Sequence, residues 1–223
     1  MDFSFLSEYY SVFIDGTKIT VGISLIALLF GCIIGIVICL MKISKSRILK
    51  AIATIYVEIL RGTPLFIQIY ILYFGLPQLN IQFPDMFGLS SAFITGAFGL
   101  SINSGAYVAE ILRSGIQSVD KGQMEASRSL GLSYVSTMRH VIVPQAIKNV
   151  LPALANEFIT LVKESAIISV IGIKDIMFSS NIVRTALYRP LEPLLIAAII
   201  YFVLTFTLSK LVGILEKKLA LSN

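Results

Sequence analysis

Ionisable and amide side chains lie inside otherwise apolar stretches of this 223-residue chain. Glu157 and Lys163 fall within one such stretch, and Asn103 and Tyr107, spaced i and i+4, fall within another. These side chains offer charge and hydrogen bonds to a bound solute. The sequence contains no Ser/His/Asp set, no Cys/His metal cluster and no GxxxxGK[ST] phosphate loop. The residue types therefore indicate binding and not catalysis.

The depth of the two ionisable residues follows from the helical rise of about 1.5 Å per residue. Lys163 is about 17 Å from Pro152 and about 15 Å from Ile173, and Glu157 is about 8 Å into the same stretch. Each charge costs roughly 2.5–3.5 kcal/mol at the centre of a membrane helix, so we expect both to face the protein interior. They are about 120° apart around the helix and need not pair. A buried ion-pair network that holds helices together is the alternative to a solute site.

A second polar group surrounds Pro64. Proline removes the hydrogen bond to the carbonyl of Leu60, and Gly62 and Thr63 precede it, so we expect the helix to kink here. A freed carbonyl and a threonine hydroxyl inside a membrane protein are usual parts of a solute site. Asn103 either joins that site or forms a hydrogen bond between helices that serves packing alone.

Two pairs of opposite charges share the sequence EILR. Glu58 and Arg61 form one pair and Glu110 and Arg113 the other, each spaced i, i+3 and able to meet on one helix face. We expect these pairs to anchor helices or to line an inner gate rather than to hold solute.

The elements that position these residues are membrane-spanning helices. Hydrophobic residues make up 56% of the chain and charged residues only 14%, which is too apolar for a soluble domain. Five stretches are long enough to cross about 30 Å of hydrocarbon. They are residues 17–41, 51–76, 89–116, 151–173 and 191–214. We expect an all-α transmembrane fold, a five-helix bundle forming a single domain over residues 1–223.

The distribution of basic residues predicts the orientation of the bundle. The connections after the first and third spans and the C-terminal tail carry most of the lysine and arginine, so by the positive-inside rule they face the cytoplasm. The N-terminus is then outside, the C-terminus inside, and residues 120–147 form a cytoplasmic loop. The net charge of +5 reflects this topology, and we expect no nucleic-acid partner.

Small residues recur at four-residue spacing in the first and third spans. Such stripes let helix backbones approach closely in lipid. They are Ala27, Gly31 and Gly35, and Ser101, Gly105 and Ala109. Each stripe fits packing within the chain or a seam between two subunits. Because five helices rarely enclose a solute path alone, we expect an oligomer.

The cytoplasmic loop has the features of a helix–turn–helix. Asp120 can cap a first helix, Gly131 can take the left-handed conformation that ends it, and Ser133 can cap a second helix. We expect that second helix to end near His140, before Pro144. It is short and amphipathic, and either docks into a groove of another protein or rests on lipid headgroups.

The spacing of Glu125-Ala126-Ser127, Gly131 and Pro144 resembles the EAA…G…P loop of ABC importer permease subunits, with Ser127 where alanine is usual. The stretches VEILRGTPLFIQIYILYFGLP and NSGAYVAEILRSGIQSVDKGQMEAS are similar to the polar amino-acid branch of this family. The resemblance implies that the short coupling helix contacts a cytoplasmic ATPase. The residues expected to make or shape that contact are Glu125, Ala126, Ser127, Gly131, Leu132, Tyr134 and Arg139.

The resemblance implies a multi-pass subunit in the plasma or inner membrane. It would import polar amino acids, would not be an enzyme itself, and would need no cofactor because partner subunits bind the ATP. Its partners would be cytoplasmic ABC ATPase subunits, an external solute-binding protein, and a second copy or a sister permease. An ion-coupled secondary transporter or channel subunit that works without an ATPase is the alternative.

The same resemblance implies a solute site near the middle of the membrane. A zwitterionic amino acid needs acceptors for its ammonium group and donors for its carboxylate, because leaving either unpaired in a dry site is costly. The residues expected to supply them are Thr63, Asn103, Tyr107, Glu157 and Lys163. Glu157 could hold either a cationic side chain or the α-ammonium group.

Overall fold

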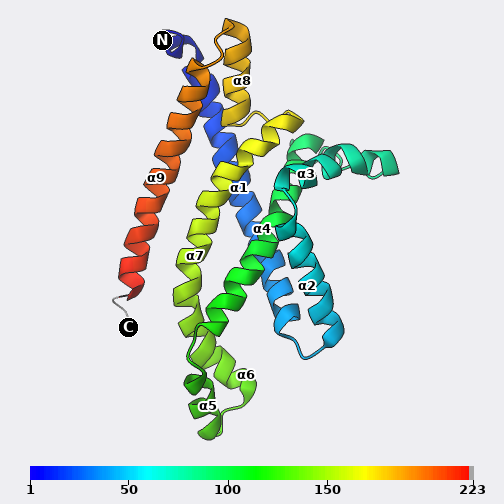
Figure 1. The fold of residues 1–223 in the computed structure, drawn as a ribbon, viewed down its shortest axis with the longest axis vertical. Coiled ribbons are helices and arrows are strands. Elements are labelled where there is room, and N and C mark those ends of the chain that lie inside the picture. The colour runs from blue at the N-terminus through cyan, green and yellow to red at the C-terminus, as the bar shows by residue number, and fades with distance from the viewer. Residues whose placement is uncertain (221–223) are drawn as a thin grey trace.

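The computed structural model describes residues 1–220, and its long helices run roughly along the long axis of the molecule, whereas α3 runs across it (Figure 1). Within this range the backbone forms no strand beyond one isolated bridge, Met86 to Leu89. The helices are α1 (Leu6–Ile43), α2 (Arg47–Gly62), α3 (Leu65–Tyr70), α4 (Ser91–Gln117), α5 (Lys121–Ser129), α6 (Tyr134–Thr137), α7 (Val143–Glu164), α8 (Ile176–Leu187) and α9 (Glu192–Ala220). Short π or 3-10 turns extend them: η1 (Ile71–Gly75), η2 (Leu76–Leu79), η3 (Met138–Ile142) and η4 (Ser165–Ile171). The predicted all-α fold is confirmed.

Two of these helices, α1 and α9, are each long and apolar enough to cross a membrane. Two bent pairs of helical segments, one within 47–79 and one within 134–187, raise the number of candidate spans to four if each pair forms one span. The 27-residue helix α4 is not among them, because glycine, serine and asparagine lower its hydropathy. It is nonetheless the most buried long helix, with its small residues packed against α1.

The two stripes of small residues face each other across α1 and α4. A Cβ atom placed on Gly31 would lie 2.9 Å from Ser104 Oγ, and one placed on Gly35 would lie 2.7 Å from Val108 Cβ. Ala109 has no exposed surface. The helices therefore touch through their backbones, as small residues allow in a membrane. Of the two interpretations of these stripes, the structure shows packing within the chain.

The predicted kink at Pro64 is a break. The segment Arg47–Gly62 and the segment Leu65–Leu79 meet at 104°, and Thr63 and Pro64 both have extended backbone between them. The single span predicted over residues 51–76 is therefore wrong as one helix. Proline removes a backbone hydrogen bond, and its ring disfavours helical geometry at the preceding residue, so the helix ends here instead of bending.

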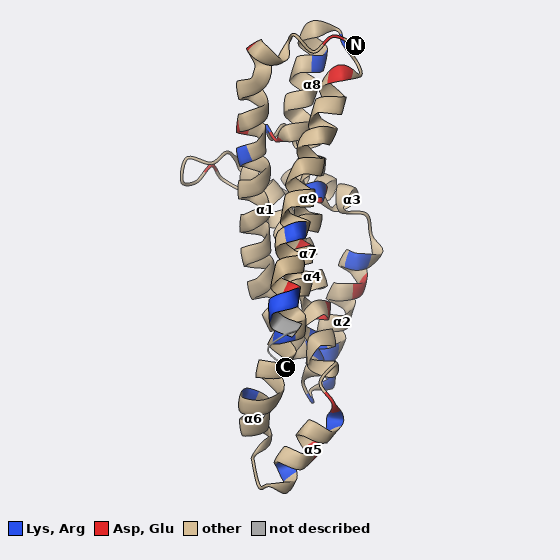
Figure 2. Cartoon of the chain, turned by 90° about the vertical axis from the view of Figure 1, so that its left-hand side faces the viewer, with Lys and Arg blue, Asp and Glu red and all other residues tan. Residues whose placement is uncertain are grey.

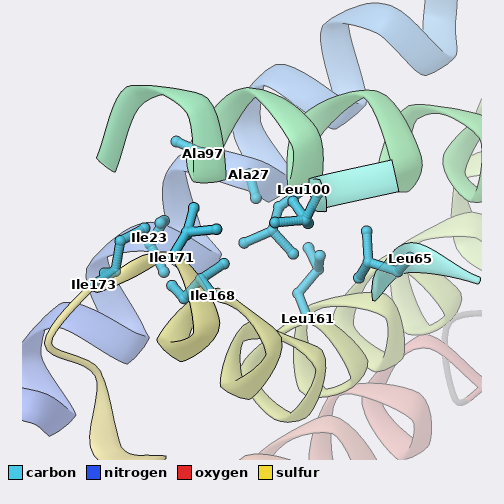
Figure 3. Packing of buried hydrophobic residues seen from close by; sticks show 10 residues of the cluster. Ile23, Ala27, Leu65, Ala97, Leu100, Leu161, Ile168, Ile171 and Ile173 are labelled. Atoms are coloured by element: carbon cyan, nitrogen blue, oxygen red, sulfur yellow. The ribbon is translucent and has the colours of Figure 1, made fainter. Parts of the chain in front are cut away.

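The largest apolar cluster joins α1, α3, α4, α7 and η4 (Figure 3). Its centre is filled by fully buried branched side chains, so α3, the element after the break, is held against α4 and α7. The buried members are Ile23, Ala27, Leu65, Ile69, Ala97, Leu100, Leu161, Ile168, Ile171 and Ile173. This cluster fixes where the break lies relative to α4 and α7.

The helix α8 occupies most of the connection between the predicted spans 151–173 and 191–214. Asp175 caps this helix by accepting a hydrogen bond of 2.8 Å from Phe178 N, and Tyr201 of α9 donates to the same carboxyl group at 3.2 Å. Thr20 of α1 accepts from Ile176 N at 3.2 Å. The buried residues Ile176, Ser179, Ser180 and Val183 have helical spacing, a signal that the polar composition of the segment obscured.

The loop of residues 120–147, which the sequence analysis placed in the cytoplasm, forms α5 and α6 at the end of the molecule opposite the N-terminus (Figure 1). Asp120 accepts from Gly122 N at 2.7 Å, Ser133 accepts from Ser136 N at 3.2 Å, and Gly131 has φ +85°, as predicted. The second helix does not end near His140, however. It continues through Pro144 into α7, because the wider π turn η3 precedes the proline and leaves space for its ring.

Candidate solute site and coupling loop

Gln68, which the sequence analysis did not single out, holds the break between α2 and α3. Its Nε2 donates to the Leu60 carbonyl at 2.8 Å, to the Thr63 carbonyl at 3.1 Å and to Thr63 Oγ1 at 2.9 Å. Gln68 is 8% exposed. The carbonyl that Pro64 leaves without a helical donor is therefore occupied within the chain. The sequence signal that could have identified Gln68 was an amide side chain one turn after the proline, in the apolar run LFIQIY.

Asn103 of α4 is part of the same network. Its Nδ2 donates to Gln68 Oε1 at 2.9 Å and to the Leu60 carbonyl at 3.3 Å, and the residue is 3% exposed. These contacts are the hydrogen bonds between helices that the sequence left open as one alternative. Asn103 thus connects α4 to the break. The side-chain carbonyl oxygen of Asn103, Oδ1, is the remaining acceptor of this amide.

Glu157 of α7 is a buried carboxyl group, 9% exposed. Ser104 of α4 donates to its Oε1 at 2.8 Å, and no ion pair of Glu157 occurs in the described part of the chain. Glu157 and Lys163, whose spacing does not require them to pair, form no ion pair among the described residues. Both were expected to face the protein interior; within this single chain Lys163 does not, because it lies on another side of α7 and is exposed.

Glu110 of α4 is surrounded by basic side chains. Lys42 of α1 forms an ion pair with it, and Arg113 contacts it at 2.6 Å, as its i, i+3 spacing predicted. The prediction that Glu58 pairs with Arg61 is wrong, since Glu58 is exposed and forms no ion pair among residues 1–220. Arg61 instead lies 3.9 Å from Glu110, because the tertiary fold brings α2 against α4.

Tyr107 lies beneath Arg61, whose guanidinium carbon is 5.2 Å from the centre of the phenol ring. This distance is that of a cation–π contact. Both side chains line a cavity of about 470 Å³ between α2, α4 and α7. The other lining residues are Glu110, Ile111, Ser114, Gly115, Ser118, Asn149 and Ala153. Of the five residues predicted to bind solute, only Tyr107 is among these, and Glu157 lies one helical turn from Ala153.

The loop between α4 and α7 presents an apolar tip. Leu130 is 85% exposed, Val135 72%, Tyr134 55% and Leu132 37%, and all four surround the Gly131 turn. Arg128 Nη1 donates to the Leu132 carbonyl at 2.7 Å and braces that turn. We call these four exposed side chains the loop tip.

Ser127 is 7% exposed and donates to the Gln123 carbonyl at 2.7 Å, so it packs inside the loop and not on its surface. Glu125, Ala126 and Arg139 are exposed. Within the EAA motif, Ser127 therefore stabilises the shape of the loop, and Glu125 and Ala126 lie on its surface. The larger apolar groups of the loop tip carry the exposed contact area.

A helical chain with apolar candidate spans, a broken span, a buried carboxyl group and a projecting helical loop has the features expected of a membrane permease. Its family is equally clear. The model of the family described as "Binding-protein-dependent transport system inner membrane component" matches residues 27–221, and the chain belongs to this family. The predicted kinship with ABC importer permeases and the predicted membrane location are thereby confirmed. The family description also favours an importer with a binding protein over an ion-coupled transporter.

Two curated relatives cover nearly the whole chain. The chain is 45% identical to the putative glutamine transport system permease protein GlnP of Rickettsia bellii (strain RML369-C), over 94% of this chain and 93% of the relative. It is 44% identical to the arginine transport system permease protein ArtQ of Bacillus subtilis (strain 168), over 98% of this chain and 97% of the relative.

Two solved structures share the fold. A chain in the crystal structure of an amino acid ABC transporter with histidines is 47% identical, with a TM-score of 0.92 over 98% of this chain and 99% of that one. A chain of the MetNI methionine ABC transporter in an inward-facing conformation is 17% identical, with a TM-score of 0.78 over 98% of this chain and 99% of that one. The second likeness shows the fold alone.

Proposed function

We propose that this chain forms half of the solute path of an ATP-driven importer of polar amino acids. The observation that carries the proposal is Glu157, a buried carboxyl group with one hydrogen bond and no cationic partner in the described part of the chain. A buried carboxylate without a counter-charge is costly, so it is retained where a ligand supplies that charge. The ammonium group of an amino acid, or a guanidinium side chain, fits this need. The names of the glutamine and arginine relatives support the same solute class.

The proposed site extends from Glu157 to the break between α2 and α3. Asn103 offers its carbonyl oxygen as an acceptor, and Tyr107 borders the cavity below. Thr63 has its hydroxyl bound by Gln68 and donates to the Ile59 carbonyl at 2.8 Å, so its role is to keep the break in shape. The bound solute would thus lie against α4 and α7.

Lys163 belongs to a polar stripe on α7 that this chain leaves exposed. Asn156 and Asn149 lie seven and fourteen residues before it, on nearly the same helix face, and both are exposed. A charged residue in a membrane helix faces protein or water and not lipid. The stripe would therefore border the path between two permease subunits, identical or sister chains, related by a two-fold axis.

The proposed topology has five spans, with the N-terminus outside and the C-terminus inside. Figure 2 shows lysine and arginine gathered toward the half that contains α5, α6 and the C-terminal end of α9. This distribution supports a cytoplasmic position for the loop tip. The solute-binding protein would then deliver solute to the end that carries the N-terminus and α8.

The loop tip is the proposed contact with the ATPase subunits, which bind and hydrolyse ATP while this chain binds no cofactor and catalyses no reaction. Its exposed apolar side chains suit a groove in a partner protein. Because α6 continues through η3 into α7, a movement of the loop tip would reach Glu157 along one helix. Closure of the ATPases would in this way switch the path between inward-open and outward-open states.

Competition uptake in vesicles that contain the permease, the ATPase subunits and the binding protein tests the proposal. Exchange of Glu157→Gln keeps the shape and removes the charge, so the affinity for the preferred solute should fall about 10-fold, the loss of a charged hydrogen bond. Glu216→Gln, exposed near the end of α9, is the matched control. Unchanged uptake by the Glu157 variant would remove it from the site, and absence of ATP-dependent uptake of every amino acid would refute the proposed function.

A further inference from the structure

The cluster around Glu110 contains more positive than negative charge. Lys42 and Arg113 form close contacts with the Glu110 carboxylate, whose side chain is 15% exposed. Arg61 reaches the same carboxylate only at 3.9 Å, and its own side chain is 42% exposed. Lys42 and Arg113 therefore form the close ion pairs of Glu110, and the guanidinium of Arg61 can bind another anion.

The position of Arg61 makes this capacity unusual. It lies near the end of α2, about 21 Å along the helix from Arg47 at 1.5 Å per residue. That depth is well inside a span that starts at the cytoplasmic side. An arginine at such a depth faces protein or a water-filled cavity and pairs with an anion where one is present. The cavity that Arg61 lines with Tyr107 is where such an anion would bind.

Arg61 and its neighbour Glu110 line the cavity, and a second carboxyl group, Glu157, lies outside it, beyond the lining residue Ala153. Arg61 and Ala153 line it, and Glu157 lies four residues beyond Ala153, about 6 Å along the same face of α7. Ser104, which binds Glu157, is likewise only three residues from Tyr107, which lies under Arg61. Glu157 thus lies about one helical turn beyond the cavity on α7, and its partner Ser104 lies about one turn from Tyr107 on α4. A zwitterion with adjacent carboxylate and ammonium groups matches this arrangement.

We propose that Arg61 binds the α-carboxylate of the transported amino acid, with Glu157 as the acceptor at the other end of the solute. This inference rests on the proposed function and assigns the carboxylate contact to Arg61, which lines the cavity, in place of the predicted Lys163, which does not. The planar guanidinium forms two parallel hydrogen bonds to a carboxylate. Tyr107 holds that plane from one side through the cation–π contact. Arg61 would thereby select amino acids over their neutral derivatives.

The test is direct binding to the purified permease–ATPase complex without the binding protein, so that only the membrane site discriminates. The probes are radiolabelled L-arginine and L-glutamine, each displaced by the free acid or by its α-amide. The native complex should bind the acid about 10- to 100-fold more tightly than the amide, the range expected for a charged bidentate contact. In Arg61→Gln the acid should bind as weakly as the amide, while Arg61→Lys should keep part of the preference.

Arg113→Gln is the control, because it removes a cation from the same carboxylate but does not line the cavity. Its ratio of acid to amide affinity should stay that of the native complex. An unchanged ratio in Arg61→Gln would overturn the inference and leave the proposed function standing, with Arg61 a gate residue. If Arg61→Gln fails to assemble, the native complex still decides, since equal affinity for acid and amide overturns the inference. Failure of the native complex to bind either amino acid would overturn both.

Discussion

The close contact of α1 with α4 predicts that two glycines of one helix respond oppositely to the same substitution. A Cβ atom on Gly35 would lie 2.7 Å from Val108 Cβ and 3.0 Å from the backbone nitrogen of Ala109. Carbon atoms pack at about 3.5–4.0 Å, so Gly35→Ala overlaps the facing helix by about 1 Å. Val108 has no exposed surface, and neither contact is the end of a flexible side chain. The helices must separate, which costs about 1–3 kcal/mol.

Gly22 is the matched control, since it lies in α1 as well and a Cβ there meets nothing within 4 Å. Gly22→Ala should leave the free energy of unfolding unchanged or raise it by up to about 1 kcal/mol through helix propensity. Unfolding of the purified chain in mixed micelles, titrated with denaturing detergent, measures both variants. Equal stability of Gly35→Ala and Gly22→Ala would show that the α1–α4 contact is looser than described, and would refute the reasoning.

The remaining predictions concern the break and the loop. Gln68→Leu removes the donor to the Leu60 and Thr63 carbonyls and should lower the free energy of unfolding by about 1–3 kcal/mol. Gln78→Leu is the control, because the amide of Gln78 is exposed. Equal stability of the two variants would contradict the hydrogen-bond network of Gln68. Gly131→Val should abolish solute-stimulated ATPase activity without affecting membrane insertion, because φ is +85° there, whereas Gly131→Asn, which tolerates this conformation, should retain it. Full transport by the valine variant would exclude a role for the turn in coupling.

Local features of the chain were predictable from sequence. The break at Pro64, the left-handed turn at Gly131 and the caps at Asp120 and Ser133 each depend on a few neighbouring residues. Proline and glycine act through their own backbone geometry, and a capping side chain reaches only two or three residues. The continuation through Pro144 was missed because a π turn just before a proline has no such simple signature.

The polar residues of the site were predictable from sequence, but the residues with which they form hydrogen bonds and ion pairs were not. Sequence identified Asn103, Glu157 and Arg61 as polar residues within apolar stretches, but it named no partner for the first two and the wrong partner, Glu58, for Arg61. The hydrogen bond from Ser104 to Glu157 spans 53 positions and that from Asn103 to Gln68 spans 35. Helical periodicity places a residue on a face, and says nothing about which helix that face meets.

By itself, the sequence determined that the chain is a membrane-embedded helical protein with a projecting loop, because hydropathy, proline and glycine act over one helix or one turn, and the resemblance of its motifs indicated a permease. Only the tertiary structure decided that Lys42 joins Arg113 at Glu110, and that Arg61 turns to Tyr107 and the cavity. The physical reason is that a charge pairs with whichever opposite charge the packed helices bring within reach. That choice follows from how α1, α2 and α4 fit together through their small residues.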